Sequence, residues 1–93
     1  MFTYGDDVEI DNRISLQKLE VFDRVVTLGG VSRAAEALGV AQPVVTEHVR
    51  SLERRLGVQL FAKEGRGLLL TEGGRLAHDW CSDILRRTRL LGR

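Results

Sequence analysis

Several hydrogen-bonding side chains of different kinds fall on one side of a predicted helix at residues 42–56. The apolar positions that recur there at helical spacing are Val45, Val49, Leu52 and Leu56. The polar positions opposite that face or at its edges are Gln42, Thr46, Glu47, Arg50 and Arg54. Amide, hydroxyl, carboxylate and guanidinium groups can hydrogen-bond the edges of nucleic-acid bases, and guanidinium groups also bind phosphates. The chemistry that this face offers is therefore recognition through hydrogen bonds.

A shorter predicted helix precedes this one and is joined to it by a tight turn. Its apolar positions are Val31, Ala34, Ala35 and Leu38. Ser32 is expected to cap its N-terminus, and Gly39 is expected to end it in a left-handed conformation. Ala35 is small enough for two helices to cross closely, and Pro43 suits a first helical turn. The pair has the make-up of a helix-turn-helix, whose second helix enters the DNA major groove, although an ordinary αα-hairpin needs the same pattern.

Two short runs with strand propensity follow the second helix. They are residues 58–61 and 68–70, and the glycine-bounded segment 62–67 between them predicts a hairpin turn. Arg66 lies at the tip of this turn with Lys63 nearby, so the hairpin resembles the wing of a winged helix. Arg66 would then reach phosphates or a minor groove. A surface turn with a solvated arginine explains the same residues equally well.

A further helix is predicted on each side of this region. Ser15 caps the first, whose apolar positions are Leu16, Leu19, Phe22, Val25 and Val26, and which Gly29 and Gly30 end. This helix should complete a three-helix core. Thr71 is a credible cap for the last helix, in which Gly73 and Gly74 either let the backbone approach DNA or mark local fraying.

The last helix carries an apolar stripe too broad for one helix of a small domain to bury alone. Its members are Leu76, Ala77, Trp80, Cys81, Ile84, Leu85 and Leu91. Trp80 and its neighbours are expected to pack on a second copy of the helix, since two-fold dimers are the commonest oligomers. Packing onto the chain's own core is the alternative.

Length and charge set the outer limits. The 93 residues make one small domain with a formal net charge of +1. Residues 1–12 hold four of the 13 acids and no base, so the rest of the chain carries a net charge of +5. We expect residues 1–14 to form a mobile acidic arm. Cys81 is the one cysteine, which excludes a disulfide framework, and neither a signal peptide nor a membrane-spanning run is evident, so we expect a cytoplasmic protein.

An enzyme is not expected. His48 and His78 lie thirty residues apart, and the sequence holds no Ser/His/Asp grouping, metal-ligand cluster or phosphate-binding loop. A protein-interaction module with the same fold remains a rival, and steep salt dependence of duplex binding would exclude it.

Five segments together resemble the N-terminal DNA-binding domain of LysR-type transcriptional regulators. They are residues 15–22, 32–35, 41–46, 52–61 and 70–74, and they include Ala34-Ala35, Gln42-Pro43, Leu56-Gly57-Val58-Gln59-Leu60-Phe61 and Leu70-Thr71-Glu72-Gly73-Gly74. The likeness covers about residues 15–91. It implies a mainly α fold, a winged helix-turn-helix at residues 15–70 with a three-helix core and a small β-hairpin wing, followed by a long linker and dimerisation helix at 71–93.

The resemblance also implies partners and a larger parent. The first partner is double-stranded DNA, which is read at an inverted repeat. The second is another copy of the chain, bound through Leu76, Trp80, Ile84 and Leu91. A full-length parent could also form a tetramer. The family carries a C-terminal effector-binding domain before which this sequence stops, so we expect an excised domain rather than a natural short form. No cofactor, metal, membrane or small-molecule site is expected in this chain.

Residue roles carry over by position. Base contacts carry over to Gln42, Pro43, Val44 and Thr46, and backbone contacts carry over to Arg33, Arg50 and Arg66. The polar face of the helix adds two expectations, a base contact for Glu47 and a phosphate contact for Arg54. Ala41 departs from the usual family serine and so loses a cap and a phosphate donor. Glu47 departs from a frequent arginine, and its carboxylate either accepts from cytosine N4, which we favour, or repels phosphate. His48 is expected to be a half-buried structural residue.

Overall fold

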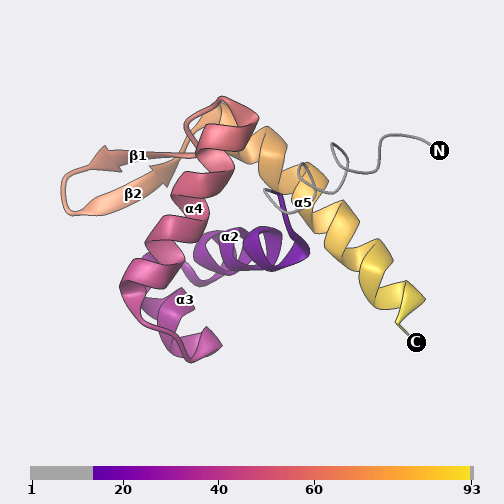
Figure 1. Cartoon of the computed structure of the whole chain (residues 1–93). Coiled ribbons are helices and arrows are strands. Elements are labelled where there is room, and N and C mark those ends of the chain that lie inside the picture. Colours follow the sequence, from indigo (N-terminus) through magenta and orange to yellow (C-terminus); the bar gives the residue numbers. More distant parts are fainter. Residues whose placement is uncertain (1–13, 93) are drawn as a thin grey trace.

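The structure is a computed structural model and describes residues 14–92. The elements in order are α2 (Leu16–Leu28), α3 (Val31–Leu38), α4 (Gln42–Leu56), β1 (Phe61–Glu64), β2 (Gly67–Leu70) and α5 (Glu72–Leu91). The hairpin and the C-terminal end of α5 extend from opposite sides of the three packed helices α2, α3 and α4 (Figure 1). The expected mainly α architecture, with a small hairpin and a long last helix, is confirmed.

Phe22 of α2 lies at the centre of the hydrophobic core. Its side chain is 1% exposed, and its ring meets the rings of Phe61 and His78 edge to face, at centroid distances of 5.7 and 5.8 Å. Phe22 therefore joins α2 to the hairpin and to α5. On the predicted apolar faces of α2 and α4, Leu16 and Leu56 are instead half exposed.

The turn between α3 and α4 depends on small residues. Ala34 and Ala35 are buried where the helices cross, as predicted. Gly39 ends α3 with a φ of 70°, and the Val40 amide donates to the Ala35 carbonyl at 3.0 Å. The prediction that Ser32 caps α3 is wrong. A helix capped by Ser32 would begin at Arg33, but α3 begins two residues earlier, at Val31, so Gly30 is the N-cap and Ser32 lies exposed in the first turn.

The hairpin is confirmed, but its strands are shifted from the predicted runs. Residues 58–60 are not a strand, whereas the pairing continues outward to Glu64 and Gly67 and leaves Gly65-Arg66 as the loop. Gly65 has a φ of 59°, which the first position of a two-residue II′ turn requires. The sequence placed these residues in a longer turn because Lys63 and Glu64 lack strand propensity, but cross-strand hydrogen bonds override propensity here.

The N-terminus of α5 is fixed to the segment before β1. The Thr71 hydroxyl accepts from the Gly74 amide at 2.8 Å and donates to the Gln59 carbonyl, while the Thr71 amide donates to the Leu60 carbonyl at 3.0 Å. Gly74 is buried so closely that an added Cβ would lie 2.2 Å from the Leu60 oxygen. The close approach at Gly74 is thus to the chain's own backbone, and the helix is formed from Glu72 onward.

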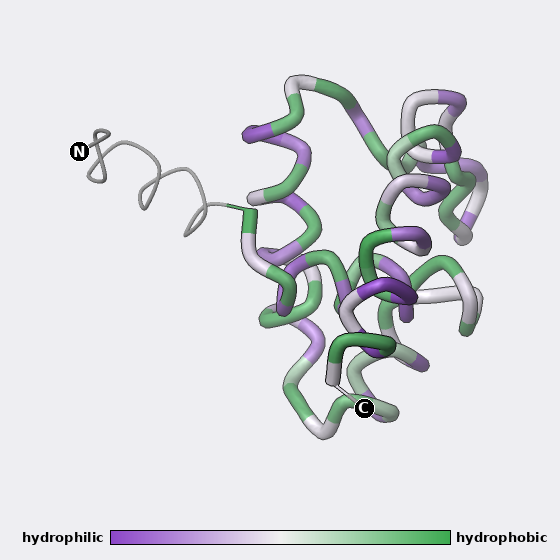
Figure 2. The backbone as a smooth tube through the Cα atoms, turned by 90° about the vertical axis from the view of Figure 1, so that its right-hand side faces the viewer, coloured by the Kyte–Doolittle hydropathy of each residue, from purple (hydrophilic) through white to green (hydrophobic). Residues whose placement is uncertain are grey.

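The apolar stripe of α5 divides into two faces. Cys81 and Leu85 are buried, and the Cys81 thiol donates to the Leu19 carbonyl of α2 at 3.1 Å. Ala77 is half buried and packs against the core. The other four members stay exposed, by 62% for Leu76, 76% for Trp80, 42% for Ile84 and 89% for Leu91. Figure 2 shows hydrophobic and hydrophilic residues alternating along the helices, which is the pattern of a two-faced helix. Packing on the chain's own core therefore accounts for only part of the stripe.

The arm assigned to residues 1–14 lies outside the described residues except for Ile14, which packs against the core. Among the residues that the structure describes, no helix combines the length and the apolar character needed to cross a membrane.

Candidate nucleic-acid interface

The first turn of α4 presents its side chains to solvent. Gln42, Pro43 and Val44 are all exposed, and Thr46 is half buried one turn further on. The N-cap of the helix is Ala41, whose side chain cannot accept a hydrogen bond from the first turn. The sequence predicted this loss of a side-chain cap. Because Val45 and Val49 bury the opposite face, the helix can present this turn without exposing its apolar side.

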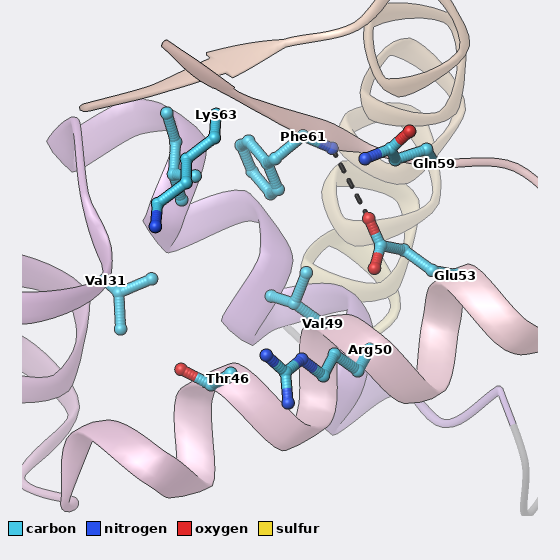
Figure 3. Close-up of a pocket in the computed structure, with 9 residues that line it drawn as sticks. Val31, Thr46, Val49, Arg50, Glu53, Gln59, Phe61 and Lys63 are labelled. Atoms are coloured by element: carbon cyan, nitrogen blue, oxygen red, sulfur yellow. Dashed lines mark hydrogen bonds between the residues drawn. The ribbon is translucent and has the colours of Figure 1, made fainter. Parts of the chain in front are cut away.

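A hollow of about 340 Å³ separates α4 from the hairpin. Thr46 and Arg50 line it from α4, and Lys63 and Phe61 line it from β1 (Figure 3). Thr46 and Arg50 thus lie beside a cation contributed by the wing. The lining of this hollow combines charged and hydrogen-bonding side chains with apolar ones, the latter being Val31, Val49, Phe61 and Leu68.

A second hollow, of about 450 Å³, adjoins the first along the hairpin. Ser32 and Arg33 of α3 line one side of it, and Lys63 and Arg66 line the other. Lys63 lines both hollows, so it lies between Arg50 of α4 and Arg33 of α3. The sequence placed Lys63 near the wing tip and predicted no role for it. Only the strand pairing brings Lys63 to a position between Arg50 and Arg33.

Glu53 holds the hairpin in this position. Its Oε2 atom accepts from the Leu60 amide at 2.8 Å and from the Phe61 amide at 3.5 Å. Figure 3 shows Glu53 on α4 reaching up to the backbone that enters β1. A charge-assisted hydrogen bond of this kind fixes the wing relative to α4, which is what a two-part binding surface requires.

Glu47 and Arg54 form an ion pair on the face of α4 opposite the core. The Arg54 Nη2 atom lies 2.7 Å from the Glu47 Oε2 atom, and both side chains are mostly exposed. The hydrogen bond and charge of Arg54, together with the charge of Arg50, lower the pKa of the Glu47 carboxyl. The sequence treated these two residues separately, with Glu47 on a base and Arg54 on a phosphate, because the seven-residue spacing gave no sign of a contact.

The candidate residues come from two parts of the fold. Those expected to contact DNA belong to α3, α4 and the wing, namely Arg33, Gln42, Pro43, Val44, Thr46, Glu47, Arg50, Arg54 and Arg66, and of these Thr46 and Arg50 line the first hollow and Arg33 and Arg66 the second. The four residues expected at a dimer interface lie on α5. His48 is half buried, as expected. The sequence gave no sign of the pair between His78 and Asp23, whose Nε2 and Oδ1 atoms lie 2.9 Å apart.

Comparison with known proteins identifies the family. Residues 16–75 match the family described as bacterial regulatory helix-turn-helix proteins, lysR family. This chain belongs to the LysR family. The HTH-type transcriptional regulator TrpI of Pseudomonas aeruginosa is 44% identical over 75 residues, which are 81% of this chain and 25% of TrpI. The regulator PcaQ of Agrobacterium fabrum is 45% identical over 65 residues, which are 70% of this chain and 21% of PcaQ.

Solved structures of LysR-family proteins share the fold. BenM_DBD in complex with catB site 1 DNA superposes with a TM-score of 0.78 at 27% identity, covering 83% of this chain and 86% of that chain. CbnR, a LysR family transcriptional regulator, superposes with a TM-score of 0.79 at 32% identity, covering 84% of this chain and 27% of that chain. The LysR-family chain described here spans about a quarter or less of the curated relatives TrpI and PcaQ. These relatives are transcriptional regulators and not enzymes, in agreement with the sequence.

Proposed function

We propose that this LysR-family domain binds double-stranded DNA with sequence specificity, with α4 in the major groove. Gln42 can bond the N6 and N7 atoms of adenine together, and the Thr46 hydroxyl can donate or accept. Pro43 and Val44 can contact a thymine methyl group, and the Glu47 carboxylate can accept from the cytosine amino group. Gln42, Pro43 and Val44 are all exposed in the first turn of α4, which supports this assignment.

Cationic side chains around α4 would hold the domain on the sugar-phosphate backbone. Arg50 lies beside the base-reading residues, and Arg66 lies at the tip of the wing. Lys63 lines both hollows, and Arg33 lines the second hollow together with Arg66. Phosphate contacts fix the register of a protein on the duplex, while base contacts select the sequence. A surface that offers both is what specific binding requires.

Two copies would bind together. Leu76, Trp80 and Ile84 form an exposed apolar row on α5, and Leu91 extends it. A second α5 packed antiparallel would cover this row and relate two recognition helices by a two-fold axis. Such a dimer reads an inverted repeat whose half-sites are about 10 base pairs apart, or a multiple of that distance. As the DNA-binding part of a transcriptional regulator, the domain would act where the chromosome lies, in the cytoplasm.

The observation that carries the proposal is the continuity between the polar end of α4 and the cationic wing, in a fold shared with a DNA-bound relative. Selection of bound duplexes from a random library tests it. We expect an enriched inverted repeat, which would give the half-site and the spacing together. Enrichment of no sequence over the starting library would contradict specific binding.

A further inference from the structure

Glu47 and Arg54 are seven residues apart, which is two turns along the same face of α4. Their side chains reach toward each other along the helix, and the 2.7 Å distance between Nη2 and Oε2 is that of a charge-assisted hydrogen bond. Counted by helical angle, both lie on the side directly opposite Val45. The pair therefore lies on the exposed side of α4, and the charge of Arg50 acts on its carboxylate.

The pair has little value for folding. The side chains are 62% and 65% exposed, and exposed ion pairs contribute little to stability because water and salt screen them. The pair does change what each group offers to a ligand. A guanidinium bound to a carboxylate has less free charge for a phosphate, and a carboxylate held by a guanidinium has fewer orientations.

We propose that Arg54 is a positioning residue, which holds the Glu47 carboxylate toward the base edges and makes Glu47 a selector for cytosine. The inference rests on the proposed function and replaces the phosphate contact that the sequence predicted for Arg54. A carboxylate accepts at both oxygens and has about four acceptor sites, so the bond from Arg54 leaves capacity for an amino group. The hydrogen bond and charge of Arg54 lower the pKa of the Glu47 carboxyl, so the pair favours the ionised, accepting form.

The choice of cytosine follows from the groove chemistry. An ionised carboxylate only accepts, so the keto oxygens of guanine and thymine repel it. Adenine offers an amino group beside the N7 acceptor, which also repels a carboxylate, whereas cytosine offers the N4 amino group alone. Among the four bases, cytosine is thus the one that a fixed carboxylate favours without a neighbouring repulsion.

The test compares four proteins, namely wild type, Glu47→Ala, Arg54→Ala and the double variant. Alanine keeps the helix, because it has the highest helical propensity. Each protein is titrated with the selected duplex and with duplexes that carry one substituted base pair, and binding to the selected duplex is repeated over a range of salt concentrations. The matched control is Arg55→Ala, which removes an exposed cation of α4 that points about 100° away from Arg54.

Each variant has a distinct expected result. Glu47→Ala should lose about tenfold in preference for cytosine at one position, a fold-change within the usual range for a specific base contact. It should also steepen the salt dependence by about 0.9 per bound subunit, because the released Arg54 can neutralise a phosphate. Arg54→Ala should weaken the same preference without changing the slope. The double variant should lose the preference and keep the wild-type slope, and Arg55→Ala should keep the preference.

The opposite pattern overturns the proposal. If Arg54 binds a phosphate in the wild-type complex, Arg54→Ala reduces the slope by about 0.9 and leaves the cytosine preference intact. A Glu47→Ala variant with unchanged preference and unchanged slope also overturns it. Failure of the proposed function has a different signature, since the wild-type domain would then bind the selected duplex no more tightly than any substituted duplex, or would retain no duplex at all.

Discussion

Gly74 of α5 lies so close to the Leu60 carbonyl that a Cβ atom at position 74 would come within 2.2 Å of its oxygen. Because that oxygen belongs to backbone, it cannot move aside cheaply. We expect Gly74→Ala to lower the free energy of unfolding by about 1–3 kcal/mol, the usual cost of overpacking, in a denaturant titration. Gly73→Ala is the matched control. Its Cβ would meet Val58 at an ordinary 3.5 Å, so it should be neutral or stabilise the helix by up to about 1 kcal/mol. Equal losses in both variants would contradict the packing described here.

Burial raises the pKa of the Cys81 thiol to about 12, while an unfolded chain returns the thiol to an ordinary pKa of about 8.5. The folded domain therefore keeps a proton that the unfolded chain releases between these values, and Cys81 makes stability fall as pH rises above about 8.5. The slope from this one group is at most about 1.4 kcal/mol per pH unit. Between pH 8 and 10.5, we therefore expect the unfolding free energy of the wild type to fall relative to that of Cys81→Ala. A difference that is constant over that range would contradict the burial of the thiol.

The exposed row on α5 predicts a dimer that one charge can break. Trp80→Lys should shift the domain to the monomer in sedimentation experiments, because Trp80 is 76% exposed at the centre of the row. The far-ultraviolet circular dichroism should stay unchanged, since this side chain takes no part in the core. Asp79→Lys, an exposed change on a neighbouring face of the same helix, should leave the dimer intact. Equal association of wild type and Trp80→Lys would exclude this interface.

Gln42 and Arg66 should fail in different ways when each is replaced by alanine. Gln42→Ala should cost about 1–3 kcal/mol of discrimination at one base position, because its amide would read a base edge. Arg66→Ala should weaken binding to specific and scrambled duplexes alike and reduce the salt slope, because its guanidinium would meet phosphates. Equilibrium titrations against matched duplexes separate the two. Equal losses of Gln42→Ala on specific and scrambled DNA would contradict the base contact.

The features set by local backbone chemistry could be predicted from the sequence. The caps Ser15 and Thr71 accept hydrogen bonds from the first turns of α2 and α5, as their residue types indicate. Ser32 misled the prediction of the start of α3, because Val31 can begin a helix after a glycine N-cap without side-chain help. The division of the α5 stripe could not be predicted, since helical spacing does not show where a neighbouring helix ends.

Contacts between distant residues were beyond the sequence. Asp23 and His78 are 55 residues apart and meet only because α5 packs across α2. Lys63 lies between Arg50 and Arg33 because the strand pairing fixes the direction of its side chain. These positions follow from tertiary packing, to which neither periodicity nor spacing gives access.

Titration of a random-sequence duplex at low ionic strength, repeated at rising salt, tests the central claim most directly. The account predicts saturable binding. The logarithm of the association constant should fall linearly with the logarithm of the salt concentration, because phosphate contacts from Arg33, Arg50 and Arg66 release counterions. The slope should correspond to several phosphates for each bound subunit. Absence of duplex retention at the lowest salt, or binding that does not respond to salt, would contradict the account.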